Sequence, residues 1–538
     1  MKTGKKIFLT VVAVLVALTG LTVLGTGADK SQFRSPWDWP AQWDPAVGMT
    51  WGSTGAHTAL YDTLVYPDQR GNPLPHAAAR WTVSEDGTEW TFFLRTDIKF
   101  HDGTTLTAED VAFSMDRWLT IGEGFSYIFS PVIDRVEAVD DYTAKFHLSI
   151  PFGPLLTALY KFYIVNKDLV LENLVKPGPY GELGDYGREF LQDKDAGSGP
   201  YRITEYRPGD YMIMERADDY WGYVTPNAPD QVIQYGLMEA VPIRLMMEKR
   251  EAEFTNPWLS PETMEALDAI EGVDLAAIPL GAVQHVEMHT KKPPLDDIHF
   301  RKAMAYATDY ETIVQQAFPT GKVGAGPVPS SVPGYDPNVK PYYLDLDKAL
   351  DELKQSKYYE DLDQYPVEFW WIGPGGTAQE KIALILQANM AKIGITLKPV
   401  EVPFARLQDV SSDMDASPHM YTLTMASLYH EAGSMLHFRY HSDGARSLDQ
   451  NEWLLDSEYD RLLDDALATV DQAERFAKYS KLQQYIVDLC PTLFLAEPAS
   501  TLAYQTEYLD WPITYGEGIP LVGYFMDPRW IQVFPELK

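Results

Sequence analysis

The clearest hydrophobic pattern in the chain lies between Trp90 and Ser114. Phe92 and Leu94 alternate with polar residues, as in a strand that is buried on one side. Gly103 follows in a His-Asp-Gly sequence, and this sequence favours a turn because glycine accepts a positive φ. The pattern therefore predicts a half-buried strand that ends in a turn.

A helix is predicted directly after this turn. Thr107 can cap its N-terminus, and Asp110, three residues later, completes a variant of the capping box. Val111, Met115 and Trp118 have the spacing of one buried helix face.

Strand and helix patterns alternate along much of the remaining chain. Residues 132–150 alternate like a β-hairpin, with its turn at Asp140 and Asp141. Apolar positions at helical spacing predict helices over 348–354 and 379–394, and two more within 458–489. No internal repeat is evident, so a solenoid or propeller is disfavoured. The mixture favours an α/β fold with more than one domain.

The N-terminus has the pattern of an export signal. Three lysines precede an apolar run over residues 7–24, and the small residues of Thr26-Gly27-Ala28 follow it. We expect a signal peptide at 1–28, with an uncleaved membrane anchor as the alternative. No cysteine follows the run, which disfavours a lipid anchor.

Composition narrows the classes of partner. The formal net charge is −33, and it is −36 without residues 1–28, which contain three lysines and no acids. Such a surface repels nucleic acid and anionic membranes, so neither is expected as a partner. Cys490 is the single cysteine. It excludes an intramolecular disulfide, and its apolar neighbours indicate a packed helix end.

The exact amino-acid sequence of these segments gives information beyond their hydrophobic periodicity. Residues 86–114, DGTEWTFFLRTDIKFHDGTTLTAEDVAFS, closely resemble the signature of the family 5 extracytoplasmic solute-binding proteins of ABC importers. Residues 197–201 (GSGPY), 220–222 (YWG) and 289–314 resemble three further elements of that family. Its members take up oligopeptides, dipeptides, nickel complexes or oligosaccharides.

The resemblance implies an α/β, periplasmic-binding-protein-like two-lobe hinge fold with an additional small third lobe. It places lobe I at 29–60, 196–284 and 500–538, the inserted small lobe II at 61–195, and lobe III at 285–499. It also implies a monomeric, non-catalytic protein of the periplasm or the outer face of the cell membrane. Such a protein closes over a small-molecule ligand and delivers it to the permease and ATPase subunits of an ABC importer.

Common enzyme motifs are absent from the sequence. It contains no G-x-x-x-x-G-K-[ST], G-x-S-x-G, H-E-x-x-H or C-x-x-C. Histidines such as His101 and His437 show no paired spacing, so no metal and no cofactor are expected, and a nickel ligand is the third choice. A secreted hydrolase is the remote alternative to a binding protein.

Three segments are predicted to line the ligand cleft. They are rich in aromatic side chains, which bury much surface and have few torsions to freeze. The second segment ends a strand before a helix, a common ligand position in α/β sheets. Trp371→Ala is expected to weaken ligand binding without unfolding the protein. The predicted ligand-binding residues are Trp51, Ser53, Thr54, Trp370, Trp371, Met425, Ser427, Leu428, Tyr429, His430 and Glu431.

The third segment bears most on the choice of ligand. In peptide-binding members of the family, the matching stretch reads W-x-x-D-Y-x-x-P, and its Asp holds the α-ammonium of the peptide. Alignment on Tyr429 places Leu428 at that position. A buried ammonium without a counter-charge is costly. Either Glu431 substitutes for the Asp, or the ligand is a neutral oligosaccharide instead of an oligopeptide.

Overall fold

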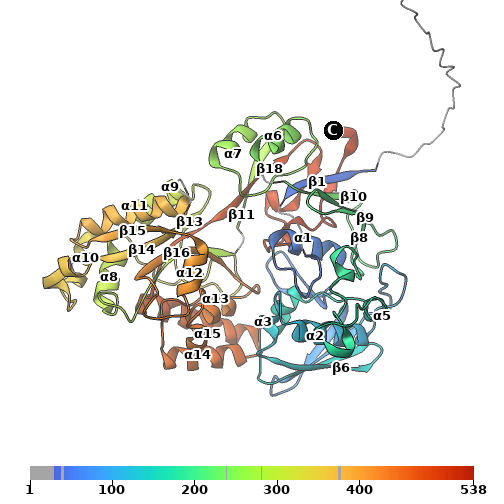
Figure 1. Ribbon diagram of the computed structural model, residues 1–538, viewed down its shortest axis with the longest axis horizontal. Helices are drawn as coiled ribbons and strands as arrows, with labels where there is room; N and C mark the ends of the chain where they lie inside the picture. Colours follow the sequence, from blue (N-terminus) through green and yellow to red (C-terminus); the bar gives the residue numbers. More distant parts are fainter. Residues whose placement is uncertain (1–29, 38–41, 238, 280, 374–376) are drawn as a thin grey trace, which may run out of the picture. The chain divides into compact units, whose positions relative to one another are not determined.

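The computed structural model describes residues 30–37, 42–237, 239–279, 281–373 and 377–538 (Figure 1). The predicted signal peptide at 1–28 lies outside the described residues. Within them, no helix has both the length and the apolar character needed to cross a membrane. Three large sheets organise the fold.

The first sheet combines the N-terminal strand with strands from the middle of the chain. Its order is β1 (Gln32–Trp37), β10 (Gln231–Gly236), β9 (Tyr211–Arg216) and β8 (Tyr201–Arg207), and only the β1–β10 pair is parallel. Helix α1 (Trp51–Leu60) contacts β8. Helices α6 (Ala240–Glu248) and α7 (Pro261–Asp268) form a smaller apolar cluster with Val273 and Ala503.

The second sheet contains the strand and the hairpin predicted from the sequence. It is antiparallel, in the order β4 (Ala78–Val83), β5 (Glu89–Leu94), β7 (Thr143–Leu148) and β6 (Ile133–Asp140). Helix α2 (Ala108–Ile121) begins after the predicted capping box and buries Val111, Met115 and Trp118. Short helices follow: α3 (Ser126–Phe129), α4 (Leu155–Ala158), the 3-10 helix η1 (Leu159–Lys161) and α5 (Lys167–Glu172).

The third sheet has six strands of mixed direction. Its order is β13 (Lys322–Val323), β17 (Thr492–Glu497), β12 (Ala282–Met288), β16 (Met420–Ala426), β14 (Val367–Ile372) and β15 (Leu397–Val402). β14 is parallel to both β15 and β16. The helices of this region are α8 (Ile298–Ala307), α9 (Tyr310–Ala317), α10 (Leu346–Leu353), α11 (Ala378–Ala391), α12 (Phe404–Val410), α13 (Ala432–Tyr440), α14 (Ser457–Ala468) and α15 (Gln472–Leu489).

Two chain crossings connect the first and third sheet regions. β11 (Val273–Pro279) precedes β12, β18 (Ala499–Gln505) follows β17, and these two connecting strands pair antiparallel with each other (Figure 1). The remaining short strands are β2 (Val65–Pro67), β3 (Pro73–Pro75), β19 (Leu509–Asp510) and β20 (Gln532–Val533). The lobe boundaries stay a prediction, although each large sheet draws nearly all of its strand residues from the ranges of one predicted lobe.

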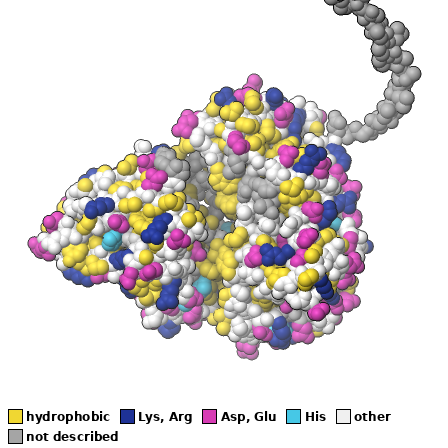
Figure 2. All heavy atoms as spheres, in the orientation of Figure 1, with side chains coloured by type: hydrophobic (Ala, Val, Ile, Leu, Met, Phe, Trp, Pro, Cys, Tyr) yellow, Lys and Arg dark blue, Asp and Glu magenta, His cyan; other side chains and the backbone are white. Residues whose placement is uncertain are grey.

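The single cysteine is found where the sequence placed it, whereas the helix predicted over 379–394 ends three residues earlier. α11 ends at Ala391 with Lys392 as its C-cap, Gly394 adopts φ +82° two residues later, and Cys490 is fully buried as the C-cap of α15. Burial raises the pKa of the Cys490 thiol to about 11. On the face seen in Figure 2, acidic and basic side chains are intermixed, which agrees with the scattered acids of the sequence.

Candidate ligand-binding site

The first predicted segment forms the start of α1. The hydroxyl of Thr50 caps the helix by accepting from the Ser53 backbone N–H at 3.2 Å. Ser53 and Thr54 are buried, and the Thr54 hydroxyl donates to the Thr50 carbonyl at 2.7 Å. Trp51 is half-buried, with its ring 5.6 Å from that of Trp258. Of the three predicted residues, only Trp51 has substantial side-chain surface to offer a ligand.

The second segment is split between the two faces of β14. Trp371 is 6% exposed and packs with Val367 and Phe369 in the large apolar core of the third sheet. Its neighbour Trp370 is half-buried on the opposite face. Strand alternation directs the Trp371 side chain into the core, which argues against the expectation that it lines the cleft.

Trp370 and the third segment share one face of the sheet. Trp370 and the half-buried Met425 pack against the small cluster of Leu407, Tyr421 and Leu423. β16, which carries Met425, is the parallel neighbour of β14. Two of the predicted segments thus contribute side chains to a single apolar surface.

The loop after β16 is held by backbone hydrogen bonds. The Ser427 N–H donates to the Gly281 carbonyl at 3.1 Å, and the Leu428 N–H donates to the Ser434 hydroxyl at 2.7 Å. Ser427 and Leu428 remain half-buried. Tyr429 is buried, with its ring 5.9 Å from that of Phe152. The loop therefore presents Ser427 and Leu428, while Tyr429 packs inside.

Glu431 is already neutralised by its own chain. It is fully buried, and its two carboxylate oxygens accept from the Arg475 guanidinium at 2.7 and 3.0 Å. The Tyr479 hydroxyl donates to the same carboxylate at 3.0 Å. This geometry contradicts the expectation that Glu431 is available to a ligand ammonium.

His430 is buried without a hydrogen-bond partner. Its side chain is 1% exposed, and neither ring nitrogen is bonded to any of the described residues. The ring lies against Gly71, where an added Cβ would be 2.2 Å from the His430 Cδ2. Burial, with a smaller contribution from the charge of Lys161, lowers the pKa of His430 to about 4.

Lys161 is a buried cation that was not predicted as a site residue. It ends η1 at 4% exposure, and its Nζ donates to the Val522 carbonyl at 3.3 Å. Within the described part of the chain, no carboxylate lies within ion-pair distance of it. Burial lowers the pKa of Lys161 to about 8. The signal in the sequence is a single lysine within the otherwise nearly apolar stretch Leu155–Val165.

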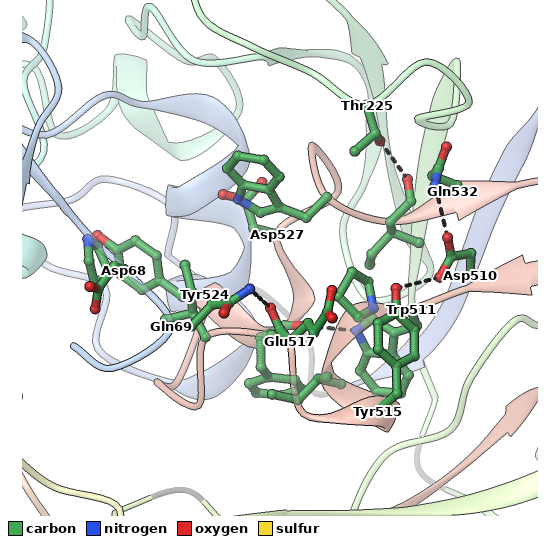
Figure 3. A pocket seen from close by; sticks show the side chains of 18 of the residues that line it. Asp68, Gln69, Thr225, Asp510, Trp511, Tyr515, Glu517, Tyr524, Asp527 and Gln532 are labelled. Atoms are coloured by element: carbon green, nitrogen blue, oxygen red, sulfur yellow. Dashed lines mark hydrogen bonds between the residues drawn. The ribbon is translucent and has the colours of Figure 1, made fainter. Parts of the chain in front are cut away.

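A separate pocket of about 430 Å³ contains none of the predicted residues. It lies around Tyr66, Trp511 and the segment after β19 (Figure 3). Among its acids, Asp510 accepts from the Tyr515 hydroxyl and from the Gln532 amide, each at 2.8 Å. The Asp510 carboxylate is thus already paired within the chain.

Two histidines at the C-terminal end of α13 have a paired spacing that the sequence analysis missed. His437 and His441 lie four residues apart and, with Asp443, bring one possible ligand atom each within 4.8 Å of one another. His441 Nδ1 is 2.7 Å from the Asp443 carboxylate. Hydrogen bonds from these two histidines lower the pKa of Asp443. The three groups therefore already pair among themselves.

Comparison with known proteins decides the family. The sequence pattern of the bacterial extracellular solute-binding proteins, family 5 (middle), matches residues 72–447. The chain belongs to this family. Its relatives include the probable D,D-dipeptide-binding periplasmic protein DdpA of Escherichia coli, at 29% identity over 80% of each chain. The dipeptide-binding protein of Escherichia coli is 24% identical, over 89% of this chain and 92% of the relative.

The fold of family 5 is also found in solved structures. The ABC transporter substrate-binding protein CtaP of Listeria monocytogenes aligns with a TM-score of 0.80. The alignment covers 94% of this chain and all of CtaP, at 22% identity. These comparisons confirm both the resemblance seen in the sequence and the α/β, periplasmic-binding-protein-like fold class.

Proposed function

We propose that this family 5 protein is the extracytoplasmic substrate-binding component of an ABC importer, with an oligopeptide or similar small polar oligomer as its ligand. The proposal rests chiefly on the apolar surface formed by Trp370 and Met425 beside the Ser427–Leu428 loop. The dipeptide-binding relatives support a peptide in preference to the other ligands of the family.

The surface suits binding by enclosure. Half-buried apolar side chains provide contact area, and the loop offers polar groups that can fix a ligand's orientation. A ligand that contacts both sides of a cleft favours the closed state, because those contacts exist only there. We assign no catalytic residue to this surface, and capture without turnover is the role that agrees with a solute-binding family.

An oligosaccharide is the second candidate. Leu428 stands where peptide binders have an Asp, and Glu431 is paired with Arg475. An α-ammonium would therefore find no acidic partner at either position. The faces of Trp51 and Trp370 suit stacking on sugar rings, which carry no charge.

The remaining features follow from the same role. The protein would be exported, act as a monomer, and pass its ligand to a membrane permease driven by ATPase subunits. Nucleic acid is not a partner, since the chain carries a formal net charge of −33.

A thermal-shift screen tests the ligand class. Protein purified after export from the full-length gene is heated with di- to pentapeptides and, separately, with glucan and mannan oligomers. A bound ligand stabilises the native state by about 2.7 kcal/mol at a hundredfold excess over Kd. We expect peptides to raise Tm. A shift with sugars alone would establish the second candidate.

Variants test the proposed surface. Trp370→Ala should reduce the ligand-induced shift while leaving the fold intact, and Tyr343→Ala, which removes an aromatic ring that is 52% exposed, is the control. An unchanged shift in Trp370→Ala would remove this surface from the site.

A further inference from the structure

The geometry points to Lys161 as the anchor for an anionic group of the ligand, namely the terminal carboxylate of a peptide, with His430 as a second polar contact. This inference rests on the proposed function and adds the charge that the ligand must carry. It depends on three observations, which concern the partners of Lys161, its position and the surrounding charges.

Among the described residues, Lys161 lacks the partners that a buried ammonium requires. An ammonium group has three N–H donors, yet the structure gives it one carbonyl acceptor, that of Val522 at 3.3 Å. The ring of Phe125, 5.3 Å from Nζ, adds only a cation–π contact. The 4% exposure of Lys161 leaves water little access to the remaining donors.

Lys161 lies between two of the predicted segments. Val522 precedes Gly523, which lies against α1, because a Cβ at Gly523 would be 2.7 Å from the Thr54 Cγ2. On the other side, the Tyr160 hydroxyl donates to the Gly71 carbonyl at 3.0 Å, and Gly71 contacts the His430 ring.

The contacts through Tyr160 and Gly71 bring the segments of Lys161 and His430 together. The charge of Lys161 contributes to lowering the pKa of His430, which agrees with this placement. His430 and Lys161 come from segments that are far apart in the sequence, so their proximity depends on the fold.

The acids around this position are already paired. Asp44 accepts from Arg117 at 2.6 Å, and Glu431 accepts from Arg475 at 2.7 Å. Asp68, whose charge acts on His430, accepts from the backbone N–H groups of Arg70 and Asn72 at 2.8 Å. Among the described residues, no carboxylate lies within ion-pair distance of Lys161. A ligand carboxylate would supply the missing charge, and charge-assisted hydrogen bonds of this kind are stronger than neutral ones. The unpartnered nitrogens of His430 provide a further donor for the same group.

Peptides with and without a terminal charge test the inference. Isothermal titration calorimetry compares each peptide of the di- to pentapeptide panel as the free acid and as the C-terminal amide, using the exported protein. The wild type should bind the free acid about tenfold more tightly, which corresponds to a single charge-assisted contact. Lys161→Met should bring this ratio close to one, and Lys161→Arg should retain part of it.

A matched control separates charge from general effects. Lys167→Met removes a lysine of the same region that pairs with the exposed Glu109, and it should keep the wild-type ratio. The inference is overturned if the wild type binds acid and amide equally, or if Lys161→Met folds and keeps the preference. If the wild type binds no peptide at all, the proposed function fails and the inference fails with it, an outcome distinct from binding without a charge preference.

Discussion

Glu431 and Lys161 are both buried charges near the predicted ligand site, and they differ in how their charges are compensated. Glu431 has a two-point ion pair with Arg475 and a hydrogen bond from Tyr479. Lys161 has one backbone carbonyl. A buried ion that its own chain satisfies has a structural role, whereas we infer that Lys161 obtains its missing partner from a ligand. The predictions below test this distinction.

Removing the partner of Glu431 should have the largest effect. Arg475→Met leaves a buried carboxylate without its counter-charge, so we expect the free energy of unfolding to fall by about 3–5 kcal/mol. Urea unfolding of the variant and the wild type measures the loss.

A double variant shows whether charge is the cause. Arg475→Met combined with Glu431→Gln should recover part of the loss, but not all of it, because Arg475 also donates to the carbonyls of Thr469 and Val470. An exposed ion pair usually contributes less than about 1 kcal/mol. If Arg475→Met alone lowers the free energy of unfolding by no more than that, the structural role of Glu431 is contradicted.

The two tryptophans of β14 repeat the distinction between structure and binding. Trp371→Ala should destabilise the protein by about 3–5 kcal/mol, since it empties a site in the core of the third sheet. Trp370→Ala should lower the free energy of unfolding much less and should mainly reduce ligand affinity. Urea unfolding and calorimetry on both variants measure stability and ligand affinity. If Trp371→Ala mainly reduces affinity and Trp370→Ala mainly reduces stability, Trp371 and not Trp370 lines the cleft.

The sequence predicted local structure better than side-chain partners. The half-buried strand, the capping box at Thr107 and the helix that became α11 were all found, because each depends on residues a few positions apart. Strand alternation puts Trp370 and Trp371 on opposite faces, yet both were predicted to line the cleft. It does not say which face is the core, since helices and strands from distant segments decide that.

The misassigned residue Glu431 and the missed residues have different causes. Glu431 meets an arginine 44 positions away, a separation that no local pattern reports. Lys161 was visible as a lysine in an apolar stretch, yet such a side chain can also extend to the surface. The four-residue spacing of His437 and His441 was present in the sequence and was overlooked.

Stability at alkaline pH should reveal the uncompensated charge of Lys161. Its pKa falls from 10.5 to about 8 on folding, so between these values Lys161 binds more protons in the unfolded chain and its contribution to stability rises with pH. Cys490 and buried tyrosines such as Tyr163, whose pKa values are raised by burial, contribute in the opposite direction. The full effect of this group is about 3 kcal/mol. His57 and His430, whose pKa values are lowered to about 3 and 4, stay neutral throughout this window.

Lys161→Met isolates this contribution. The variant should be more stable than the wild type at pH 7, because it removes a buried ammonium, and this difference in the free energy of unfolding should shrink as pH rises from 8 to 10.5. Chemical denaturation across this range measures both quantities. A variant that is less stable than the wild type at pH 7 with an unchanged slope would mean that Lys161 is compensated in the folded protein.

Leu428→Asp should have the smallest effect, and it tests the alignment of the third segment. The backbone of Leu428 is held by Ser434, so the substitution changes the side chain without moving the loop. Because the side chain is half-buried, an Asp here stays ionised and gives a peptide's α-ammonium the partner that Glu431 does not provide. We expect peptides to bind about tenfold more tightly, the effect of one charge-assisted contact. A neutral oligosaccharide should bind more weakly, because the new charge must lose water without gaining a partner.

Leu428→Asn is the control. Asn has the shape of Asp without its charge, so this variant should leave peptide affinity near that of the wild type. If Asp and Asn act alike, position 428 does not contact the ammonium, and the peptide is held by its carboxylate end alone.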